Sequence, residues 1–437
     1  MAERDTRRHD WARWLYSATL YALSPLIWRR VWRERMLTHP RRQRLGLIAP
    51  TPAEERVVWL HCASVGEVLA ARPLIEALVA RYPAHRLVVT TMTATGAERV
   101  HALADSLANQ GDSGEVSHYF VPLDFPGAAN RFVRRLRPEL ALIFETELWP
   151  NLLHACERCA VPVVVVNGRL SPRAYAGYCK LRPLMRDALA RLAWLAAKSS
   201  ADAERFIALG MAPGRLTVVG SLKYDLAIGD GDFRRSERLR TRLGERPIWV
   251  AGSTHPGEDE QLLEAHAQLR ESYPAALLIL VPRHPQRFDA VGELCRERGM
   301  KLARRSRDEL PEADTAVYLG DTMGELLDFY GASDIAFVGG SLVPIGGHNL
   351  LEPAAMGVPV VTGPALANFS DVAETLREAG ALVEVADGDS LARELVRLFG
   401  DGLERQRLSR AGQAVVTANR GALGRTLEGL ERYLQAK

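Results

Sequence analysis

Residues 57–80 have the sequence VVWLHCASVGEVLAARPLIEALVA, and this stretch decides the fold class. The run Val57–Leu60 is continuously apolar, which predicts a strand that is buried on both faces. From Val68 to Ala80 the apolar residues instead recur with the spacing of one helix face. A buried strand that leads directly into a helix is half of a βαβ unit, so the stretch predicts a parallel sheet covered by helices.

The same alternation continues on both sides of a polar, charged segment. In the first half a helix is predicted at Ala128–Leu136, and strands at Leu87–Thr90, Leu140–Phe144 and Val163–Val166. In the second half the predicted strands are Ile248–Ala251, Leu277–Val281, Ala316–Leu319, Ile335–Val338 and Val358–Thr362, with a last helix at Leu423–Leu434. We therefore expect two doubly wound α/β domains, 45–215 and 246–437, with a linker at 216–245. Such sheets bind ligands beyond the carboxyl ends of their strands, so we expect the site in a cleft between the domains.

Composition supports a globular protein with a basic N-terminus. Of the 437 residues, 47% are hydrophobic and 25% are charged, which excludes a disordered or fibrous chain. The net charge is +3, but residues 1–44 contain eleven arginines and four acidic residues. Because the basic excess is confined to this segment, nucleic-acid binding is not expected.

The five cysteines indicate a reducing compartment, since their number is odd and their spacing irregular. Cys156 and Cys159 form a CxxC pair, but no second pair follows at the spacing of a zinc site. We expect packing rather than metal binding.

The segment Trp11–Trp28 is apolar and aromatic, contains Arg13 and Pro25, and is followed by further arginines. It is at the lower limit of the ~20 residues that span a bilayer, whereas tryptophans beside arginines suit a helix in the interface of an anionic membrane. We expect residues 1–44 to form a membrane anchor that either spans the bilayer or lies in its interface. The alternative is a helix packed against the protein body.

Acidic residues follow two predicted strands of the first half. Glu67 lies at the start of a predicted helix, where its carboxylate could either stabilise the helix dipole or act as a general base. Glu145 and Glu147 follow the strand Leu140–Phe144 and need partners if they are buried. They could form salt bridges, or Glu145 could stabilise charge on a reacting sugar.

In the second half, Arg283 follows a strand at a place where a guanidinium can bind phosphate. A glycine-rich stretch, GGSLVPIGGHNLLEP at 339–353, also follows a strand and precedes a helix. The N–H groups at a helix start can bind phosphate, and Glu352 could accept hydrogen bonds from a ribose. The glycine spacing matches neither the Rossmann nor the Walker A pattern, and a tight structural turn is the alternative interpretation.

Eight motifs in sequence resemble one family. They are SVGEV at 64–68, PLDFP at 122–126, ETELWPN at 145–151, NGRLSPRA at 167–174, GSLKYD at 220–225, PRHPQRF at 282–288, GDTMGEL at 320–326 and GGHNLLEP at 346–353. Together they are similar to the transferases of Kdo, 3-deoxy-D-manno-octulosonic acid. The likeness runs from about residue 11 to about residue 430, and the ordered set is far more specific than any one motif.

The resemblance implies a GT-B fold, in which two Rossmann-like domains face each other across a cleft. It also implies a CMP-Kdo donor, a tetra-acylated lipid A precursor as acceptor, and inverting transfer in lipopolysaccharide biosynthesis without an obligatory metal or other cofactor. The expected location is the cytoplasmic face of the inner membrane.

The resemblance also assigns roles to residues. Glu67 would be the base that takes a proton from the acceptor 6′-hydroxyl, and Glu145 and Lys223 would stabilise the transition state. The residues implied for the CMP pocket are Pro282, Arg283, Met323, Gly324, Glu325, Asn349, Leu350, Leu351 and Glu352.

Two alternatives to this function are another enzyme of the same fold and a protein from a different class. A transferase or 2-epimerase acting on a UDP-sugar would share the fold and Glu352, but not the anchor together with SVGEV and ETELWPN. A non-catalytic lipid-binding protein would account for the basic N-terminus but not for the acids and glycines at several strand ends.

Overall fold

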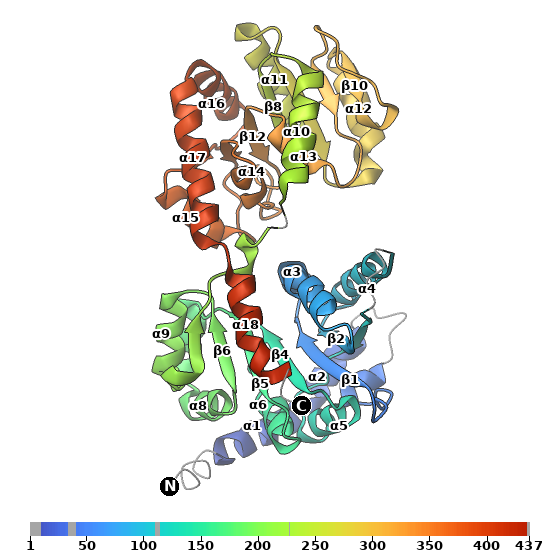
Figure 1. Cartoon of the computed structure of the whole chain (residues 1–437), viewed down its shortest axis with the longest axis vertical. Helices are drawn as coiled ribbons and strands as arrows, with labels where there is room; N and C mark the ends of the chain where they lie inside the picture. Colours follow the sequence, from blue (N-terminus) through green and yellow to red (C-terminus); the bar gives the residue numbers. More distant parts are fainter. Residues whose placement is uncertain (1–9, 34–40, 110–113, 227, 435–437) are drawn as a thin grey trace. The chain divides into compact units, whose positions relative to one another are not determined.

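The computed structural model describes residues 10–33, 41–109, 114–226 and 228–434. The chain forms two compact units (Figure 1). One comprises Met1–Asp225 together with Arg420–Lys437, and the other comprises Leu226–Asn419. The expected pair of parallel α/β domains is confirmed, and each unit is described below by itself.

The first unit contains a seven-stranded parallel sheet with the order β3-β2-β1-β4-β5-β6-β7. Its strands are β1 (Arg56–His61), β2 (His85–Thr91), β3 (Val116–Phe120), β4 (Leu140–Phe144), β5 (Val163–Gly168), β6 (Trp194–Ala197) and β7 (Leu216–Val218). Alternate strand residues point to opposite faces, so that Trp59 packs into one core and Val58 into the other. Both faces are apolar because helices cover both.

Two groups of helices cover this sheet. One face carries α3 (Val65–Arg81), α4 (Ala94–Asn109) and α18 (Ala422–Leu434). The other carries α5 (Pro126–Leu136), α6 (Pro150–Arg158), α8 (Arg182–Ala190) and α9 (Ser200–Leu209). The chain adds β2 and β3 on one side of β1 and then returns to place β4 on the other side. The loops after β1 and β4 therefore diverge at the point where doubly wound sheets bind ligands.

The second unit repeats this plan with the order β10-β11-β9-β8-β12-β13-β14. Its strands are β8 (Ile248–Thr254), β9 (Leu277–Pro282), β10 (Leu302–Arg304), β11 (Val317–Leu319), β12 (Ile335–Val338), β13 (Val360–Thr362) and β14 (Leu382–Glu384). Its helices are α10 (Asp230–Leu243), α11 (Asp259–Ser272), α12 (Phe288–Glu297), α13 (Leu326–Gly331), α14 (Leu351–Ala355), α15 (Ser370–Glu378), α16 (Gly388–Gly400) and α17 (Gly402–Asn419). The strand order reverses between β8 and β12, so the loops after these two strands form the corresponding ligand-binding point.

The domain bounds differ from those expected. Residues 216–245 are no separate linker, because β7 pairs with β6 and α10 packs on α13. The C-terminal helix α18 belongs to the first unit, where its apolar face joins the core. Asp225 binds this helix start: its carboxylate oxygens accept hydrogen bonds from the N–H groups of Gly421 and Leu423 at 2.6 and 2.7 Å.

The N-terminal segment forms two helices rather than the expected single one. Helix α1 (Asp10–Ala22) ends before Leu23, and α2 (Ser24–Arg33) begins with Pro25 near its start. Proline lacks an N–H and is tolerated only in the first turn of a helix, so the apolar run is divided there. Helix α1 contacts α6 and α8. Among the described residues, no helix is both long and apolar enough to cross a membrane.

Helix α1 packs on the first unit through its polar face. The Asp124 carboxylate is 7% exposed and accepts hydrogen bonds from the N–H groups of Asn151 and Leu152 at the start of α6, at 3.1 and 2.8 Å. Tyr16 of α1 hydrogen-bonds to the same carboxylate, and Ser17 donates to the Asn151 side chain at 3.1 Å. Burial raises the pKa of Asp124 to about 7, although these hydrogen bonds act in the opposite direction. The motifs PLDFP, through Asp124, and ETELWPN, through Asn151, therefore meet where α1 packs on α6.

The opposite face of α1 is apolar and exposed. The side chains of Trp11, Trp14 and Leu15 are 58%, 65% and 61% exposed. A helix normally buries its apolar face, and large exposed aromatic groups mark an interaction surface.

Asp124→Ala should lower the free energy of unfolding of the first unit by about 2 kcal/mol, because it removes a helix cap and leaves buried partners unsatisfied. Urea denaturation followed by tryptophan fluorescence measures this loss. Asp105→Ala, on the exposed surface of α4, is the control and should have little effect. Equal denaturation midpoints for the two variants would contradict the structural role of Asp124.

Candidate active site

Glu67 lies in the first turn of α3, directly beyond β1. Its carboxylate accepts hydrogen bonds from the N–H of Ala63 at 2.8 Å and from the Ser64 hydroxyl at 3.2 Å. Ser64 is the N-cap of α3 and in turn accepts the Glu67 N–H at 3.4 Å, so the two side chains form a reciprocal cap. This cap holds the carboxylate at the helix start in one position.

The protonation of Glu67 is strongly perturbed. Its pKa is raised to about 7, mainly by burial and also by the charges of Glu145 and Glu147, whereas the Ala63 and Ser64 hydrogen bonds act in the opposite direction. A carboxyl group with a pKa near neutrality can exchange a proton at physiological pH. The structure thus defines the environment of Glu67, a buried helix start near two further carboxylates, which its position in the sequence could not specify.

Glu145 directly follows β4, on the strand next to β1. Its φ angle is 59°, and its N–H donates to the Val166 carbonyl at 2.9 Å. The left-handed conformation is unfavourable for a residue other than glycine, by about 1–3 kcal/mol, and such strain is concentrated at functional sites. Burial raises the pKa of the Cys62 thiol, and the charges of Glu67 and Glu145 add to this effect. The two carboxylates therefore lie around the same point of the sheet edge.

Glu147 is a third acid of this cluster, with a different bonding pattern. It accepts a hydrogen bond from the Trp149 indole at 2.6 Å. Burial raises its pKa, and the Glu145 charge contributes, while the Trp149 bond lowers it. No described residue forms a salt bridge with Glu145 or Glu147. The salt-bridge interpretation of this acid pair is therefore not supported.

Lys223 lies in the short 3₁₀ helix η4 (Leu222–Tyr224), which contacts α3. The Asn167 side chain, at the end of β5, accepts the Leu222 N–H at 3.2 Å and fixes this turn. The structure therefore brings the segment of Lys223 to the helix that carries Glu67. All three residues expected to be catalytic belong to the first unit.

The residues expected to bind CMP belong to the second unit. Pro282 ends β9, and the Arg283 side chain is exposed and has no hydrogen bond or ion pair with a described residue. Glu352 accepts a hydrogen bond from the Asn349 amide at 3.1 Å. Burial raises the pKa of Glu352, whereas Asn349 and the positive charge of Arg283 lower it. Arg283, Asn349 and Glu352 are thus neighbours.

The other expected donor residues contribute differently. Leu350 and Leu351 are fully buried, so only their backbone can meet a ligand. Met323 is 62% exposed in the loop after β11, the strand beside β9. In the same loop Glu325 is bound by Arg305 at 2.7 Å and by Thr322. Burial tends to raise the pKa of Glu325, but these bonds hold it below its usual value.

Sequence reasoning missed Glu258, which is fully buried beside the glycine-rich loop. Its carboxylate accepts four backbone N–H groups, those of His255, Gly340, Ser341 and Leu342, at 2.7–2.9 Å. The N–H groups of Gly340, Ser341 and Leu342 are therefore already bound by a carboxylate, and they are not the helix-start groups that were expected to bind phosphate. Helix α14 is also only five residues long, and Asn349 accepts the Leu351 N–H. Glu258 lies in the acidic stretch GEDE at 257–260, and nothing in this stretch indicates that one of its acids is buried and binds backbone N–H groups.

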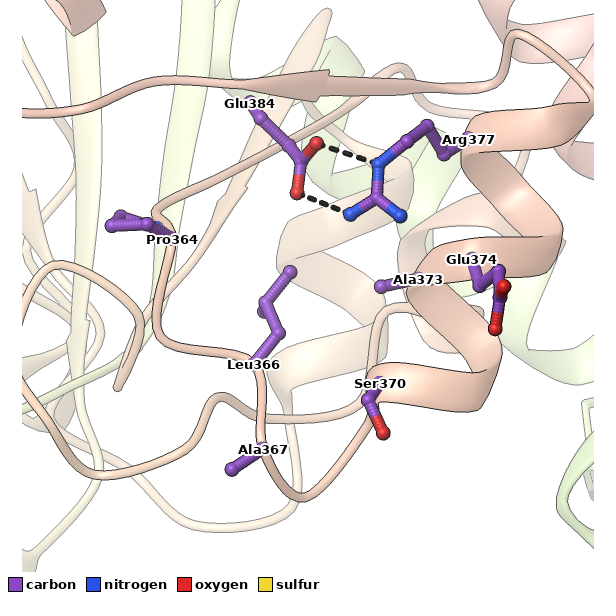
Figure 2. A pocket seen from close by; sticks show the side chains of 8 residues that line it. All are labelled: Pro364, Leu366, Ala367, Ser370, Ala373, Glu374, Arg377 and Glu384. Carbon is purple, nitrogen blue, oxygen red and sulfur yellow. Dashed lines mark hydrogen bonds and ion pairs between the residues drawn. The ribbon is translucent and has the colours of Figure 1, made fainter. Parts of the chain in front are cut away.

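An open pocket elsewhere in this unit contains none of the expected residues. Figure 2 shows its lining, from the loop after β13 to α15 and β14, with an ion pair between Arg377 and Glu384 at 2.7 Å. Within the described part of the chain, no three His, Cys, Asp or Glu side chains are grouped so that they could hold a metal ion. Cys156 is buried in the core, as expected for a packing residue.

Comparisons with known proteins agree with this architecture. Residues 39–226 match the family model described as 3-Deoxy-D-manno-octulosonic-acid transferase (kdotransferase), and residues 259–415 match Glycosyl transferases group 1. A 3-deoxy-D-manno-octulosonic acid transferase of Haemophilus influenzae is 44% identical over 380 residues, which cover 86% of this chain and 87% of that protein. A transferase of the same name from Bordetella pertussis is 36% identical over 97% of this chain and 99% of its own.

A solved structure shows the fold alone. The putative UDP-N-acetylglucosamine 2-epimerase of Listeria monocytogenes covers 88% of this chain and 97% of its own, with 15% identity and a TM-score of 0.53. Two parallel α/β units and the glycosyltransferase family models define a glycosyltransferase with GT-B-like units. The chain belongs to the family of Kdo transferases. The resemblance inferred from the eight motifs is confirmed.

Glu145→Gln should lower the pKa of Glu67, because it removes a neighbouring negative charge that disfavours ionisation. Carbon NMR of labelled glutamate carboxyls over a pH titration measures this value. The matched control is Glu76→Gln in the same helix, where Glu76 pairs with Arg72. An unchanged Glu67 pKa in the Glu145 variant would show that the two carboxylates do not interact.

Proposed function

We propose that this protein transfers Kdo, with inversion, from CMP-Kdo to the 6′-hydroxyl of a tetra-acylated lipid A precursor in lipopolysaccharide biosynthesis. Membership of the Kdo transferase family supports the assignment of Kdo as the transferred sugar. The observation that carries the mechanism is the half-buried Glu67, held at a helix start with a pKa of about 7.

Glu67 is proposed as the general base. The acceptor oxygen forms a bond to the anomeric carbon of Kdo, and its proton passes to the Glu67 carboxylate. The bond from that carbon to the phosphate oxygen breaks, and its electron pair leaves with CMP. CMP is already a good leaving group, so orientation, one base and stabilisation of charge suffice.

Glu145 and Lys223 are proposed to stabilise the transition state. A negative carboxylate near an oxocarbenium-like carbon and a positive ammonium near the leaving phosphate or the sugar carboxylate both match the charge that develops. Both residues lie on segments around α3, and Glu145 already acts electrostatically on Glu67. The protein supplies these charges from its own side chains, so the reaction is proposed to need no obligatory metal.

The donor pocket is proposed to consist of the nine residues implied by the family motifs. The guanidinium of Arg283 suits the phosphate of CMP, and Glu352 suits the ribose hydroxyls. The backbone of Leu350 and Leu351, and the loop of Met323, Gly324 and Glu325, would contact the cytosine and the ribose. A UDP-sugar enzyme would share the fold, but the relatives that match most of this chain are Kdo transferases.

The acceptor is a lipid, and we propose that the protein works at the cytoplasmic face of the inner membrane. The exposed face of α1, with Trp11, Trp14 and Leu15, supports contact with the bilayer interface. Arginines of the N-terminal segment would favour anionic lipid. Four of the eleven arginines of residues 1–44, within residues 1–9 and 34–40, lie outside the described part of the chain.

Glu67→Gln should reduce Kdo transfer by about 10²–10⁴-fold, the usual contribution of a general base, and should leave CMP affinity unchanged. Mass spectrometry of the lipid A precursor, after incubation with freshly generated CMP-Kdo, measures transfer and counts the added Kdo units. Glu76→Gln is the control. Near-normal transfer by the Glu67 variant would remove this residue as the base.

Arg283→Ala should weaken CMP binding by about tenfold or more, since it removes a charge-assisted contact to phosphate. Calorimetric titration with CMP measures the affinity. Arg298→Ala is the control, because Arg298 lies at the far end of α12 and pairs with Glu264. An unchanged CMP affinity in the Arg283 variant would place this residue outside the pocket.

Replacing Trp11 and Trp14 together by glutamate should reduce binding to vesicles of anionic phospholipid, because two exposed aromatic anchors become charged. Flotation of the protein with vesicles measures the bound fraction. Phe233, exposed on α10 in the second unit, offers a control position for the same substitution. Equal flotation of wild type and double variant would exclude α1 as the contact.

A further inference from the structure

Three histidines from three different loops meet at the carboxyl edge of the second sheet. His255 follows β8, His284 follows β9 and His348 follows β12. The Nε2 atoms of His255 and His348 are 2.8 Å apart, and their rings are stacked with centroids 5.0 Å apart and planes at 8°. His284 meets His255 edge-on at 5.4 Å. Because a hydrogen bond joins the two Nε2 atoms, one ring carries a proton there and the other accepts it.

The backbone around this histidine pair is built to hold it. Gly340 has φ 69°, and a Cβ at this position would lie 3.0 Å from Cδ2 and 3.1 Å from Nε2 of His348. The Glu258 carboxylate accepts the N–H groups of both His255 and Gly340, and so ties the loop of each histidine to the other. A side chain at residue 340 would push the rings apart. The short contact between the histidines is therefore a consequence of the loop geometry.

The surroundings keep the pair uncharged. Burial lowers the pKa of His255 and lowers that of His348 to about 4. The positive charges of Arg283 and His284 act in the same direction on both rings, and Arg287 does so on His255, whereas Glu258 opposes them at His255. At neutral pH the pair is thus a neutral donor and acceptor beside the cations Arg283 and Arg287.

The cations near the pair are not equivalent. Arg287 donates to the Thr254 carbonyl at 2.8 Å and pairs with Asp259, so its charge is largely compensated. Arg283 has no such partner among the described residues, although its charge acts on His348, His255 and Glu352. An anion that binds Arg283 would therefore come close to the histidine pair and would favour its protonated form.

We propose that the His255–His348 pair is a proton-linked receptor for the phosphate of the donor nucleotide, which takes up one proton when that phosphate binds beside Arg283. This inference rests on the proposed function, since it assigns the phosphate of CMP to this edge of the sheet. The two rings share the added proton as an imidazolium hydrogen-bonded to an imidazole. The positive charge then opposes the extra negative charge that CMP gains when its bond to the sugar breaks.

The pair acts through charge: it gains and loses only a proton, and it forms no covalent bond to the donor or the acceptor. Glu67 still accepts the proton of the acceptor, while the proton on the histidine pair comes from solvent and returns to solvent when CMP leaves. His255 and His348 are therefore additional binding residues of the donor site. Glu258 and Gly340 are positioning residues, because they act only by holding the two rings together.

Isothermal titration calorimetry of the full chain with CMP tests the proposal. Titrations at pH 7.5, in several buffers with different ionisation enthalpies, give the number of protons taken up on binding. We expect about one proton for the wild type with CMP and none with cytidine, which lacks the phosphate. His255→Asn and His348→Asn should each abolish the uptake and weaken CMP binding by roughly tenfold, because asparagine can hydrogen-bond but not titrate.

His284→Asn is the matched control, since this ring touches His255 but stands outside the pair, and it should keep the proton uptake. Uptake that persists in both pair variants, or that disappears only in the His284 variant, would overturn the proposal. If the wild type binds CMP without proton uptake, the role of the histidine pair is wrong but the proposed donor stands. If the wild type does not bind CMP, the proposed donor is wrong as well. Thermal unfolding and circular dichroism establish that each variant is folded, and the comparison of CMP with cytidine needs no variant.

Discussion

Both candidate sites depend on one topological constraint, the reversal of strand order beside the first strand of each sheet. In the first unit this reversal places the loops after β1 and β4 side by side, and in the second unit those after β8 and β12. Because the crossovers are right-handed, the two loops lead to helices on opposite faces of the sheet. They therefore separate at this point and leave room for a ligand between them. Glu67 and Glu145 meet at one such point, and His255 and His348 at the other.

Buried carboxylates hold the loops at these points in place. Glu258 binds four backbone N–H groups across two loops, Asp124 binds the start of α6 together with α1, and Asp225 binds the start of α18. A carboxylate can be buried when several N–H groups replace its water, and it then joins segments far apart in the chain. Glu67 also accepts an N–H, but burial raises its pKa to about 7, and the charges of Glu145 and Glu147 contribute to this rise. Structural and reactive acids thus differ in their neighbours, not in their residue type.

Much of the fold could be predicted because long apolar runs need burial on both faces. The strands β1, β4, β5, β8 and β9 follow directly from such runs. Residues 216–218, which form β7, were expected in a linker, and α18 was expected in the second domain. Strand β7 is only three residues long, and α18 joins the first unit through tertiary contacts, namely hydrogen bonds to Asp225 and packing in the core. The apolar segment Trp11–Trp28 likewise contains no signal that α1 would attach through its polar residues to Asp124 and Asn151.

The sequence by itself determined the fold class, the family and the positions of the acidic and basic residues at strand ends, because these depend on local pattern and on ordered motifs. Only the tertiary structure decided what each of these residues contacts. Glu258 and Glu67 both lie at helix starts after a first strand, yet one is fully bound by backbone N–H groups and the other is close to two further acids. Hydrogen bonds and charge interactions depend on distances of a few ångströms between atoms, and the positions of two residues along the chain do not specify how far apart they lie in the folded protein.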